Sequence, residues 1–507
     1  MTYKNPVIRG YHPDPSICRA GKDFYMVAST FEFFPGVPIF HSKNLVNWEL
    51  ISYCLTDEEQ LPLEGCRPSG GIFAPTIRYH DGIFYMITTN ITGGGNFIVH
   101  TRDIRGKWST PAWVDQPGID PSLLFDGGKV YFTGTGFENG QQVIHLFQVD
   151  PMTGERLENP VAISEGCGGI CPEAPHLYRI GEYYYLTLAE GGTEYGHMVT
   201  IQRSKSPYGP YEPCPHNPIL THRHLNSPIK ATGHADIVED QNGNWWLVCL
   251  GIRPLPHNML HNIGRETFLT PMTWRDGWPI VGNGGTIAME MDGPLPAGVE
   301  PVSFDFEDYF SEDRFHLRWN WLRNPEINNY TLRSQGGVAL TGSDITLSTP
   351  DASPTWLGIR QPEIHAEAQA EFIVNPVEGQ RSGLTAYYAD GYHYGAYVTK
   401  EGDQVYACLT LRVHNIEQTF RRLLPDYQDS IAFKAVADER AYHFYYKTAE
   451  EWVLLGSGLA AGLCTEATWQ MTFTGTYFAL FSERGEAICT RFAMNAYEYD
   501  ENKMRRL

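Results

Sequence analysis

The chain has 507 residues and a formal net charge of −21. A chain of this length should form two or three domains and bury a large core. The negative charge argues against partners such as nucleic acid or an anionic membrane, which need basic protein surfaces, and no apolar run is long enough to span a bilayer.

The composition favours strands and turns. There are 29 Tyr, 25 Phe and 12 Trp, which suit β-strands and flat, sugar-like ligands. There are also 50 Gly and 34 Pro, which suit turns. Together these counts predict an all-β protein whose ligand is neutral.

A short phrase recurs five times in the first 250 residues: a turn with Gly or Asp, followed by an aromatic strand. Its aromatic residues, separated by 60, 46, 53 and 62 positions, are Tyr25, Tyr85, Tyr131, Tyr184 and Trp246. This period, with several short strands per copy, is typical of β-propeller blades. A β-sandwich with unrelated hairpins is the alternative, but strand-turn-strand units recurring without helical segments favour five blades.

The second part of the chain has a different pattern. Residues 291–301 are rich in Pro and Gly and read as a linker. Alternating strands then return without the five-fold phrase, and residues 386–399 place an Asp-Gly turn between two aromatic strands. We therefore predict a five-bladed β-propeller at 1–291, a linker at 292–303 and a C-terminal β-sandwich accessory domain at 304–507.

Three carboxylates, Asp14, Asp120 and Glu173, each lie beside a proline and next to a strand-like run. Proline fixes φ and restricts its neighbour, so these carboxylates should sit on stiff backbone. A single motif of this kind would be explained by an ordinary turn, where Asp-Pro and Pro-Glu pairs are common. Three together favour glycosidic-bond cleavage, which needs two rigid carboxylates in separate environments and can use a third to tune them.

Cysteine use and the N-terminal residues bear on the compartment. Cys18, Cys249 and Cys408 lie in apolar runs, where cysteine behaves as a small buried hydrophobe. Cys167 and Cys171 are four positions apart, but no second pair or His cluster completes a zinc site. The N-terminus carries no charged-then-apolar signal segment. We expect reduced thiols, no metal site and a cytoplasmic location.

Several motifs act together as a signature. They are residues 5–17, 29–38, 69–75, 172–178, 233–236 and 264–267. Jointly they resemble glycoside hydrolase family 43, in particular its β-xylosidase/α-L-arabinofuranosidase type. The resemblance runs from residue 5 into the predicted sandwich, so it covers essentially the whole chain.

The resemblance implies an inverting exo-glycosidase whose propeller is the catalytic domain, with a pocket at its axis. Asp14 matches the general base, Glu173 the general acid, and Asp120 the carboxylate that orients the acid and raises its pKa. These roles agree with the chemistry. Inversion needs carboxyls about 6.5–9.5 Å apart, a neighbouring anion raises an acid's pKa, and an ionised base needs hydrogen-bond donors.

The resemblance also implies a sugar-binding pocket. The positions that match its aromatic walls are Phe31, Phe73 and Phe137, although a Phe taken alone is more often part of a hydrophobic core than of a ligand wall. Arg265 matches an arginine that binds sugar hydroxyls, and its five donors suit a polyol. Thr193 matches a further polar contact, and Phe473 matches a residue that relatives insert from the sandwich.

His234 matches a central histidine beneath the carboxylates, which in some relatives lies near a cation or a water. We expect it to support the site structurally, with no metal ligand assigned, no cofactor required and calcium optional. The stretch 253–265 is shorter than in the longest xylosidase relatives. This leaves room for arabinofuranosyl side chains.

The expected activity is release of xylose from the non-reducing end of β-1,4-xylo-oligosaccharides, as in xylan degradation, with α-L-arabinofuranosidase side activity. One alternative is a predominant α-L-arabinofuranosidase. The other is a non-catalytic carbohydrate-binding propeller, which would not need a proline-locked acid beside a third carboxylate. The expected partners are xylo-oligosaccharides or arabinosylated oligosaccharides, with no nucleic acid and no membrane. A homo-oligomer is compatible with the sequence.

Overall fold

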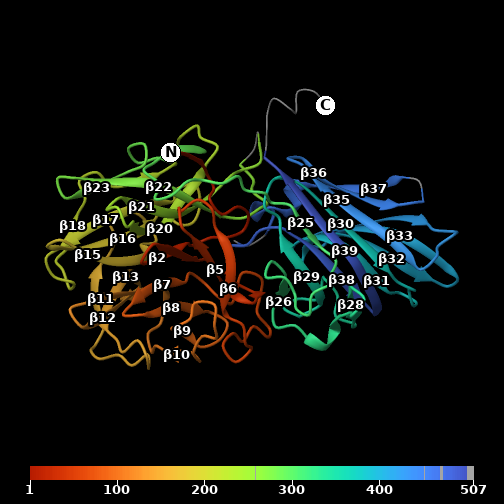
Figure 1. The fold of residues 1–507 in the computed structure, drawn as a ribbon, viewed down its shortest axis with the longest axis horizontal. Coiled ribbons are helices and arrows are strands. Elements are labelled where there is room, and N and C mark those ends of the chain that lie inside the picture. Colours follow the sequence, from red (N-terminus) through yellow and green to blue (C-terminus); the bar gives the residue numbers. More distant parts are fainter. Residues whose placement is uncertain (257–258, 450, 469–471, 499–507) are drawn as a thin grey trace.

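The computed structural model describes residues 1–256, 259–449, 451–468 and 472–498. In these ranges the regular elements are strands and three short 3-10 turns, η1 (Ile327–Asn329), η2 (Ala460–Leu463) and η3 (Thr465–Ala467). Two units lie side by side, one coloured red to green and the other teal to blue (Figure 1). None of the described helices is long and apolar enough to cross a membrane.

The first unit has five antiparallel sheets, each built from strands that follow one another along the chain, except that the first sheet omits β4 (Phe33–Phe34). The first sheet contains β2 (Ser16–Ala20), β3 (Asp23–Val27), β5 (Gly36–Ser42) and β6 (Glu49–Leu55). The second contains β7 (Thr76–His80), β8 (Ile83–Asn90), β9 (Gly95–Thr101) and β10 (Ala112–Trp113). The third contains β11 (Ile119–Asp126), β12 (Lys129–Glu138), β13 (Gln141–Gln148) and β14 (Val161–Ser164).

The last two sheets follow the same plan. The fourth contains β15 (Glu173–Ile180), β16 (Tyr183–Glu190), β17 (Met198–Ser204), β18 (Glu212–Pro213) and, beside β17, β19 (Leu220–Thr221). The fifth contains β20 (Lys230–Glu239), β21 (Trp245–Ile252), β22 (Glu266–Arg275) and β23 (Trp278–Val281). In every sheet the recurring aromatic phrase forms the second strand, which confirms the five-bladed propeller.

The ring of blades closes on itself. The first strands of neighbouring blades contact one another in turn, and β20 of the fifth blade contacts β2 of the first. Near the two ends of the propeller, β1 (Thr2–Lys4) pairs with β24 (Glu290–Asp292) in a separate two-stranded sheet. The five first strands therefore surround a common axis, and residues at their starts can share one site.

The second unit is a β-sandwich of two eight-stranded sheets. One sheet contains β25 (Phe306–Asp308), β27 (Tyr330–Leu332), β28 (Val338–Gly342), β30 (His365–Ile373), β35 (Ser430–Ala437), β36 (Ala441–Lys447), β37 (Trp452–Leu459) and β39 (Gly485–Tyr497). The other contains β26 (Asn320–Leu322), β29 (Thr355–Arg360), β31 (Arg381–Ala389), β32 (Tyr392–Glu401), β33 (Gln404–Val413), β34 (Ile416–Leu423), β38 (Tyr477–Glu483) and β4 (Phe33–Phe34). The predicted hairpin at 386–399 is confirmed, because β31 pairs with β32 across its turn.

One strand of the second sheet comes from the propeller. β4 pairs with β26, so that Phe34 lies opposite Trp321 and Phe33 opposite Leu322. The sandwich therefore extends its sheet onto a propeller segment that is adjacent to Phe31. The boundaries 1–291, 292–303 and 304–507 stay a prediction, since β24 itself spans residue 291.

Buried charges also connect the two units. Arg253, in the loop between β21 and β22, donates to Glu266 at 2.7 and 2.8 Å and to Glu363 of the sandwich at 2.8 Å. Arg9 of the propeller pairs with the same Glu363. Buried ion pairs of this kind are costly to break, because the remaining charge stays desolvated. They anchor the short loop that carries Arg265.

Candidate active site

The three carboxylates stand at kinks where inner strands begin. Asp14 precedes β2 and Asp120 lies in β11, with φ of 56° and 55°, and Ala174, directly after Glu173, has φ of 53°. The pairing registers of β11 and β15 shift at these points. Such bulges re-aim side chains next to active sites. Here they direct carboxylates from three blades to one end of the axis.

Asp14 is a buried carboxylate surrounded by donors, with 5% of its surface exposed. The Ser29 hydroxyl donates to Oδ2 at 2.5 Å and Arg265 Nη1 donates to Oδ1 at 3.1 Å, while His234 Nδ1 lies 3.6 Å from Oδ1. Burial alone would raise the pKa of Asp14, but Arg265, His234 and Ser29 outweigh it and lower that pKa. Asp14 is therefore ionised at neutral pH.

The pKa values of Glu173 and Asp120 are shifted upward, in the opposite direction to that of Asp14. Burial raises the pKa of Glu173, and the charge of Asp14 raises it further, although Gln142, which donates to Oε1 at 3.1 Å, opposes this. Burial and then the charge of Glu173 raise the pKa of Asp120 well above its ordinary value. The backbone N–H of Ala174 donates to Asp120 at 3.2 Å and connects the two carboxyls.

The sequence predicts that Asp120 is an anion that raises the pKa of Glu173. In the structure, burial and then the charge of Glu173 raise the pKa of Asp120, whereas the charge that raises the pKa of Glu173 is that of Asp14. The pair therefore retains a proton to higher pH than an isolated carboxyl would. One ionised carboxylate, Asp14, and one proton-holding pair are the two components that acid–base cleavage requires.

The predicted pocket residues gather around Arg265. Its Nη1 bridges Asp14 and the Thr193 hydroxyl, both at 3.1 Å, and its Nη2 lies 3.4 Å from the Phe473 carbonyl oxygen. The guanidinium carbon also lies 5.8 Å from the ring centre of Phe31 and 5.3 Å from that of Phe473. A cation held over aromatic faces and beside a carboxylate is suited to binding sugar hydroxyls.

An aromatic cluster forms one wall. The ring centroid of Phe31 lies 5.2 Å from that of Phe73 and 5.6 Å from that of Phe473. Phe31 is 2% exposed and has φ of 49°, so it forms the base of the cluster. Phe137 lies apart from it: near the end of β12, it is 68% exposed and opposite Gln142, the donor to Glu173.

Phe473 reaches the propeller from the sandwich. Its backbone N–H donates to the Ser69 hydroxyl at 2.9 Å, and the Ser69 N–H in turn donates to the buried Glu32 carboxyl at 2.9 Å. Three residues after Phe473, Thr476 donates its backbone N–H to the Asn262 carbonyl at 2.8 Å. These contacts hold Phe473 beside Phe31 and Phe73, two of the other predicted wall residues.

His234 lies beside Asp14, with its Nδ1 3.6 Å from Oδ1 of the carboxylate. Burial lowers its pKa, although the charge of Asp14 opposes this, so the ring is a neutral support. The ring of His197 packs where a Cβ at Gly233 would stand, 2.2 Å away, which explains the glycine in the motif. Within the described ranges, no group of three His, Cys, Asp or Glu residues is arranged to hold a metal ion.

Sequence reasoning did not select Arg78 and Asp236, which connect the five blades below the site. Arg78 on β7 donates to Asp236 on β20 at 2.8 Å and to His176 Nδ1 on β15 at 2.9 Å. It also reaches the Ser122 hydroxyl on β11 at 3.4 Å, and Asp236 accepts from the Ser16 hydroxyl on β2 at 2.7 Å. Asp236 lies in the 233–236 motif, whereas Arg78 stands outside every motif.

Comparison with protein families gives two matches that divide the chain as the fold does. The model described as glycosyl hydrolases family 43 matches residues 3–279. The model described as the β-xylosidase C-terminal concanavalin A-like domain matches residues 307–497.

Individual relatives match over nearly the whole length. A protein of Bacteroides ovatus named non-reducing end α-L-arabinofuranosidase BoGH43B is 41% identical, covering 96% of this chain and 92% of its own. A β-xylosidase of Bacillus subtilis is 36% identical over 76% of this chain and 77% of its own. The solved structure titled Bacteroides ovatus Xyloglucan PUL GH43B superposes with a TM-score of 0.93 at 38% identity, covering 98% of this chain and 100% of that chain.

Proposed function

The chain belongs to glycosyl hydrolase family 43, and on that premise we propose that it removes single pentose units from oligosaccharides with inversion. The main substrate would be β-1,4-xylo-oligosaccharides, cleaved at the non-reducing end to release xylose, with α-L-arabinofuranosidase side activity. Membership of a hydrolase family leaves no support for the alternative of a non-catalytic carbohydrate-binding propeller.

The contrast between Asp14 and Glu173 is the observation that carries the proposal. The pKa of Asp14 is lowered and that of Glu173 is raised, although both are largely buried. In an inverting hydrolysis, Asp14 accepts a proton from water as the water oxygen bonds to the anomeric carbon. Glu173 gives its proton to the departing glycosidic oxygen as the carbon–oxygen bond breaks. Proton exchange with solvent then restores both groups.

The remaining residues would serve binding. We assign Arg265 and Thr193 to sugar hydroxyls, and Phe31, Phe73 and Phe473 to the apolar faces of the ring. The exposed Phe137 is assigned to the entrance, where a leaving group would pass the Gln142–Glu173 pair. His234 supports Asp14. We propose no required cofactor; optional calcium, a possible homo-oligomer and a cytoplasmic location stay predictions from the sequence.

A second candidate, a predominant α-L-arabinofuranosidase, is supported by one comparison. The relative that is 41% identical over 96% of this chain is named an α-L-arabinofuranosidase, whereas relatives named β-xylosidase are 33% and 36% identical. Xylopyranose and arabinofuranose present similar outlines near the scissile bond, so one pocket can accept both.

Paired substrates test the proposal. The kcat/KM of the wild-type enzyme would be measured with nitrophenyl β-D-xyloside and nitrophenyl α-L-arabinofuranoside, and proton NMR would record the anomer formed first. A higher value for the xyloside, with an inverted anomer, is expected. A higher value for the arabinofuranoside would establish the second candidate, and cleavage of neither would overturn both.

A further inference from the structure

A cavity of about 350 Å³ lies between the propeller and the sandwich, next to the active site. Thr193, Arg265 and Phe473 line it and also belong to the site described above. Neither Asp14 nor Glu173 is among its lining residues. The cavity therefore lies next to the catalytic carboxylates, with Arg265 between it and Asp14.

A fixed carboxylate stands in the outer wall of this cavity. Glu466 of η3 accepts hydrogen bonds from the backbone N–H of His261 at 3.0 Å and from His261 Nδ1 at 2.8 Å. The Tyr195 hydroxyl lies 3.4 Å from the same carboxylate. Burial would raise the pKa of Glu466, but its bonds to His261 outweigh this and lower it. The carboxylate stays ionised and retains lone pairs for ligand hydroxyls.

The opposite wall offers a donor. The Thr193 hydroxyl, which lines the cavity, accepts a hydrogen bond from Arg265 Nη1 at 3.1 Å. A hydroxyl that accepts one hydrogen bond can still donate its own proton, so this O–H is suited to a ligand oxygen. The rings of Tyr195 and Phe473 add apolar surface.

The volume fits one sugar ring. At about 30 Å³ per water, the cavity corresponds to about a dozen waters, and a pentosyl unit has about ten non-hydrogen atoms. Hydroxyl acceptors, a donor and aromatic faces match a neutral polyol. A carboxylated sugar is disfavoured by Glu466, and by Glu194, which also lines the cavity.

Resting on the proposed function, we propose that this cavity is a second pentose-binding site beside the catalytic pocket. A pentose ring that could bind in this cavity has two sources. The ring could be a further unit or branch of the bound oligosaccharide, or it could be free pentose released by the reaction. In either case Arg265 contacts the ligands on both sides.

Two variants test the site by opposite means. Tyr195→Ala removes an aromatic wall, and Thr468→Trp fills the cavity from the sandwich side. Kinetics would be measured with a nitrophenyl pentoside, which carries a single pentosyl unit, and with linear and arabinose-branched xylotriose. Inhibition by free xylose and free arabinose would be measured with the nitrophenyl substrate.

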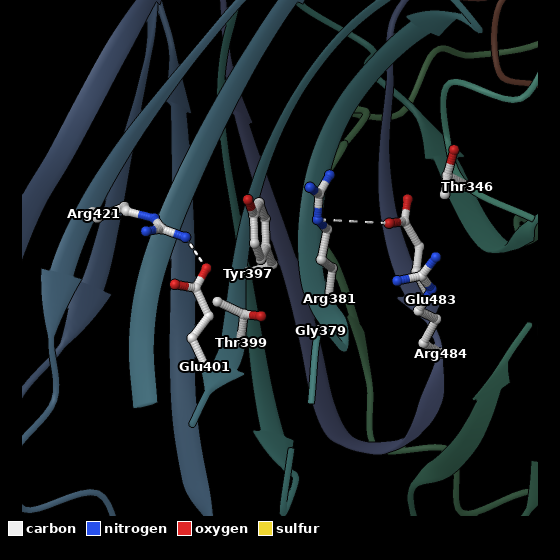
Figure 2. Close-up of a pocket in the computed structure, with 9 residues that line it drawn as sticks. All are labelled: Thr346, Gly379, Arg381, Tyr397, Thr399, Glu401, Arg421, Glu483 and Arg484. Carbon is white, nitrogen blue, oxygen red and sulfur yellow. Dashed lines mark hydrogen bonds and ion pairs between the residues drawn. The ribbon is translucent and has the colours of Figure 1, made fainter. Parts of the chain in front are cut away.

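A matched control comes from another pocket. Figure 2 shows a pocket of about 240 Å³ in the sandwich, where Arg421 pairs with Glu401 and Arg381 lies 4.0 Å from Glu483. Its lining residues all lie between positions 346 and 484, within the sandwich, and include none of the active-site residues. Arg421→Ala removes an exposed charge there and should change none of the measured constants.

If the second ring belongs to the substrate, KM for a linear or branched oligosaccharide should rise about tenfold in both cavity variants, corresponding to about 1.4 kcal/mol, with nitrophenyl hydrolysis unchanged. If it is free pentose, only the noncompetitive part of pentose inhibition should disappear. Unchanged constants throughout, or equal losses on all substrates in folded variants, would overturn the proposal. Failure of the wild type to cleave nitrophenyl pentosides would instead overturn the proposed function.

Discussion

The rings of Phe31 and Phe473 stack with centroids 5.6 Å apart and planes inclined by 29°. Phe31 belongs to the propeller and Phe473 to the sandwich, so the wall of the active site is shared between two domains. Each domain contributes a segment to the other, because β4, which begins two residues after Phe31 in the propeller, pairs as an edge strand with β26 of the sandwich. Burial of both rings stabilises the domain interface and shapes the pocket at once.

Ser69→Ala should weaken substrate binding more than turnover. The Ser69 hydroxyl accepts the Phe473 N–H, and an unpaired buried donor costs about 1–3 kcal/mol. We expect KM for nitrophenyl pentosides to rise about tenfold and kcat to change less, because the Ser69 hydroxyl bonds to the loop and not to a carboxylate. Steady-state kinetics would separate the two constants.

A suitable control is Ser52→Ala on β6, whose hydroxyl donates to the adjacent Tyr53 carbonyl at 3.5 Å and lies outside the active site. It should leave both constants unchanged. If Ser69→Ala also leaves KM unchanged, other contacts suffice to hold Phe473 in place, and Ser69 is not a positioning residue.

Arg78→Met should destabilise the propeller. Arg78 neutralises the buried Asp236, and removal of one partner from a buried pair costs about 3–5 kcal/mol. The pKa of Asp236 is lowered in the fold, mainly by Arg78 acting against burial. Its contribution to stability is therefore present above its unfolded pKa of about 4 and is lost as pH falls through the folded value.

Urea unfolding at pH 7 and at about pH 3 would measure both effects. The variant should lose stability at pH 7, and its stability should fall less on acidification than that of the wild type. The exposed Arg105→Met is the control and should lie within about 0.5 kcal/mol of the wild type. A similarly small loss in Arg78→Met would show that the blades are held together without this cluster.

Local sequence signals were sufficient for the blades and for the three carboxylates. Each blade repeats a turn and an aromatic strand, and Asp14, Asp120 and Glu173 lie in proline-bearing motifs. These features depend on residues that are neighbours in the chain. The five-fold count and the order propeller, then sandwich, could therefore be predicted, while the exact domain boundaries stay a prediction.

Contacts between residues that are far apart in the chain are harder to predict from the sequence. The bond between Ser69 and Phe473 joins residues 404 positions apart, and β4 is a strand of only two residues. Arg78 bonds to other blades through an ordinary-looking strand position. The raised pKa of Asp120 arises from burial together with two other carboxyls, a property of the assembled site that its own motif does not contain.

Asp14→Ala should reduce turnover by about 10²–10⁴-fold, the usual contribution of a general base. The fold should remain nearly intact, because Asp14 lies at the start of β2 and outside the cluster that joins the blades. Nitrophenyl pentoside kinetics and urea unfolding would be compared with those of Asp115→Ala, whose side chain is 96% exposed. Normal turnover in a folded Asp14→Ala enzyme would exclude Asp14 from the mechanism.

Glu173→Ala should affect poor leaving groups most. A sugar alkoxide cannot depart without protonation, whereas a nitrophenolate needs little help, so xylobiose hydrolysis should fall by about 10²–10⁴-fold and nitrophenyl xyloside hydrolysis much less. The ratio of kcat/KM for the two substrates is the measurement. Equal losses on both would mean that Glu173 acts in binding or positioning.

Asp120→Asn tests the coupling between the two proton-holding carboxyls. Asn keeps the shape of Asp120 and can still accept the Ala174 N–H, but it cannot take on the negative charge that an ionised Asp120 would set against ionisation of Glu173. The pKa of Glu173 should fall, so the protonated acid is lost at lower pH. In profiles of kcat/KM against pH, the alkaline limb should therefore move to lower pH.

The acid limb should move less in the same variant, because it reports ionisation of Asp14, whose pKa is set mainly by burial opposed by Arg265, His234 and Ser29. Both limbs describe coupled groups, so the direction of movement is the expected result. Asp115→Asn again serves as the control. An unchanged alkaline limb in a folded Asp120→Asn enzyme would mean that Asp120 itself carries the shared proton in the wild type. Its contribution to catalysis would then be to orient Glu173 through the Ala174 backbone.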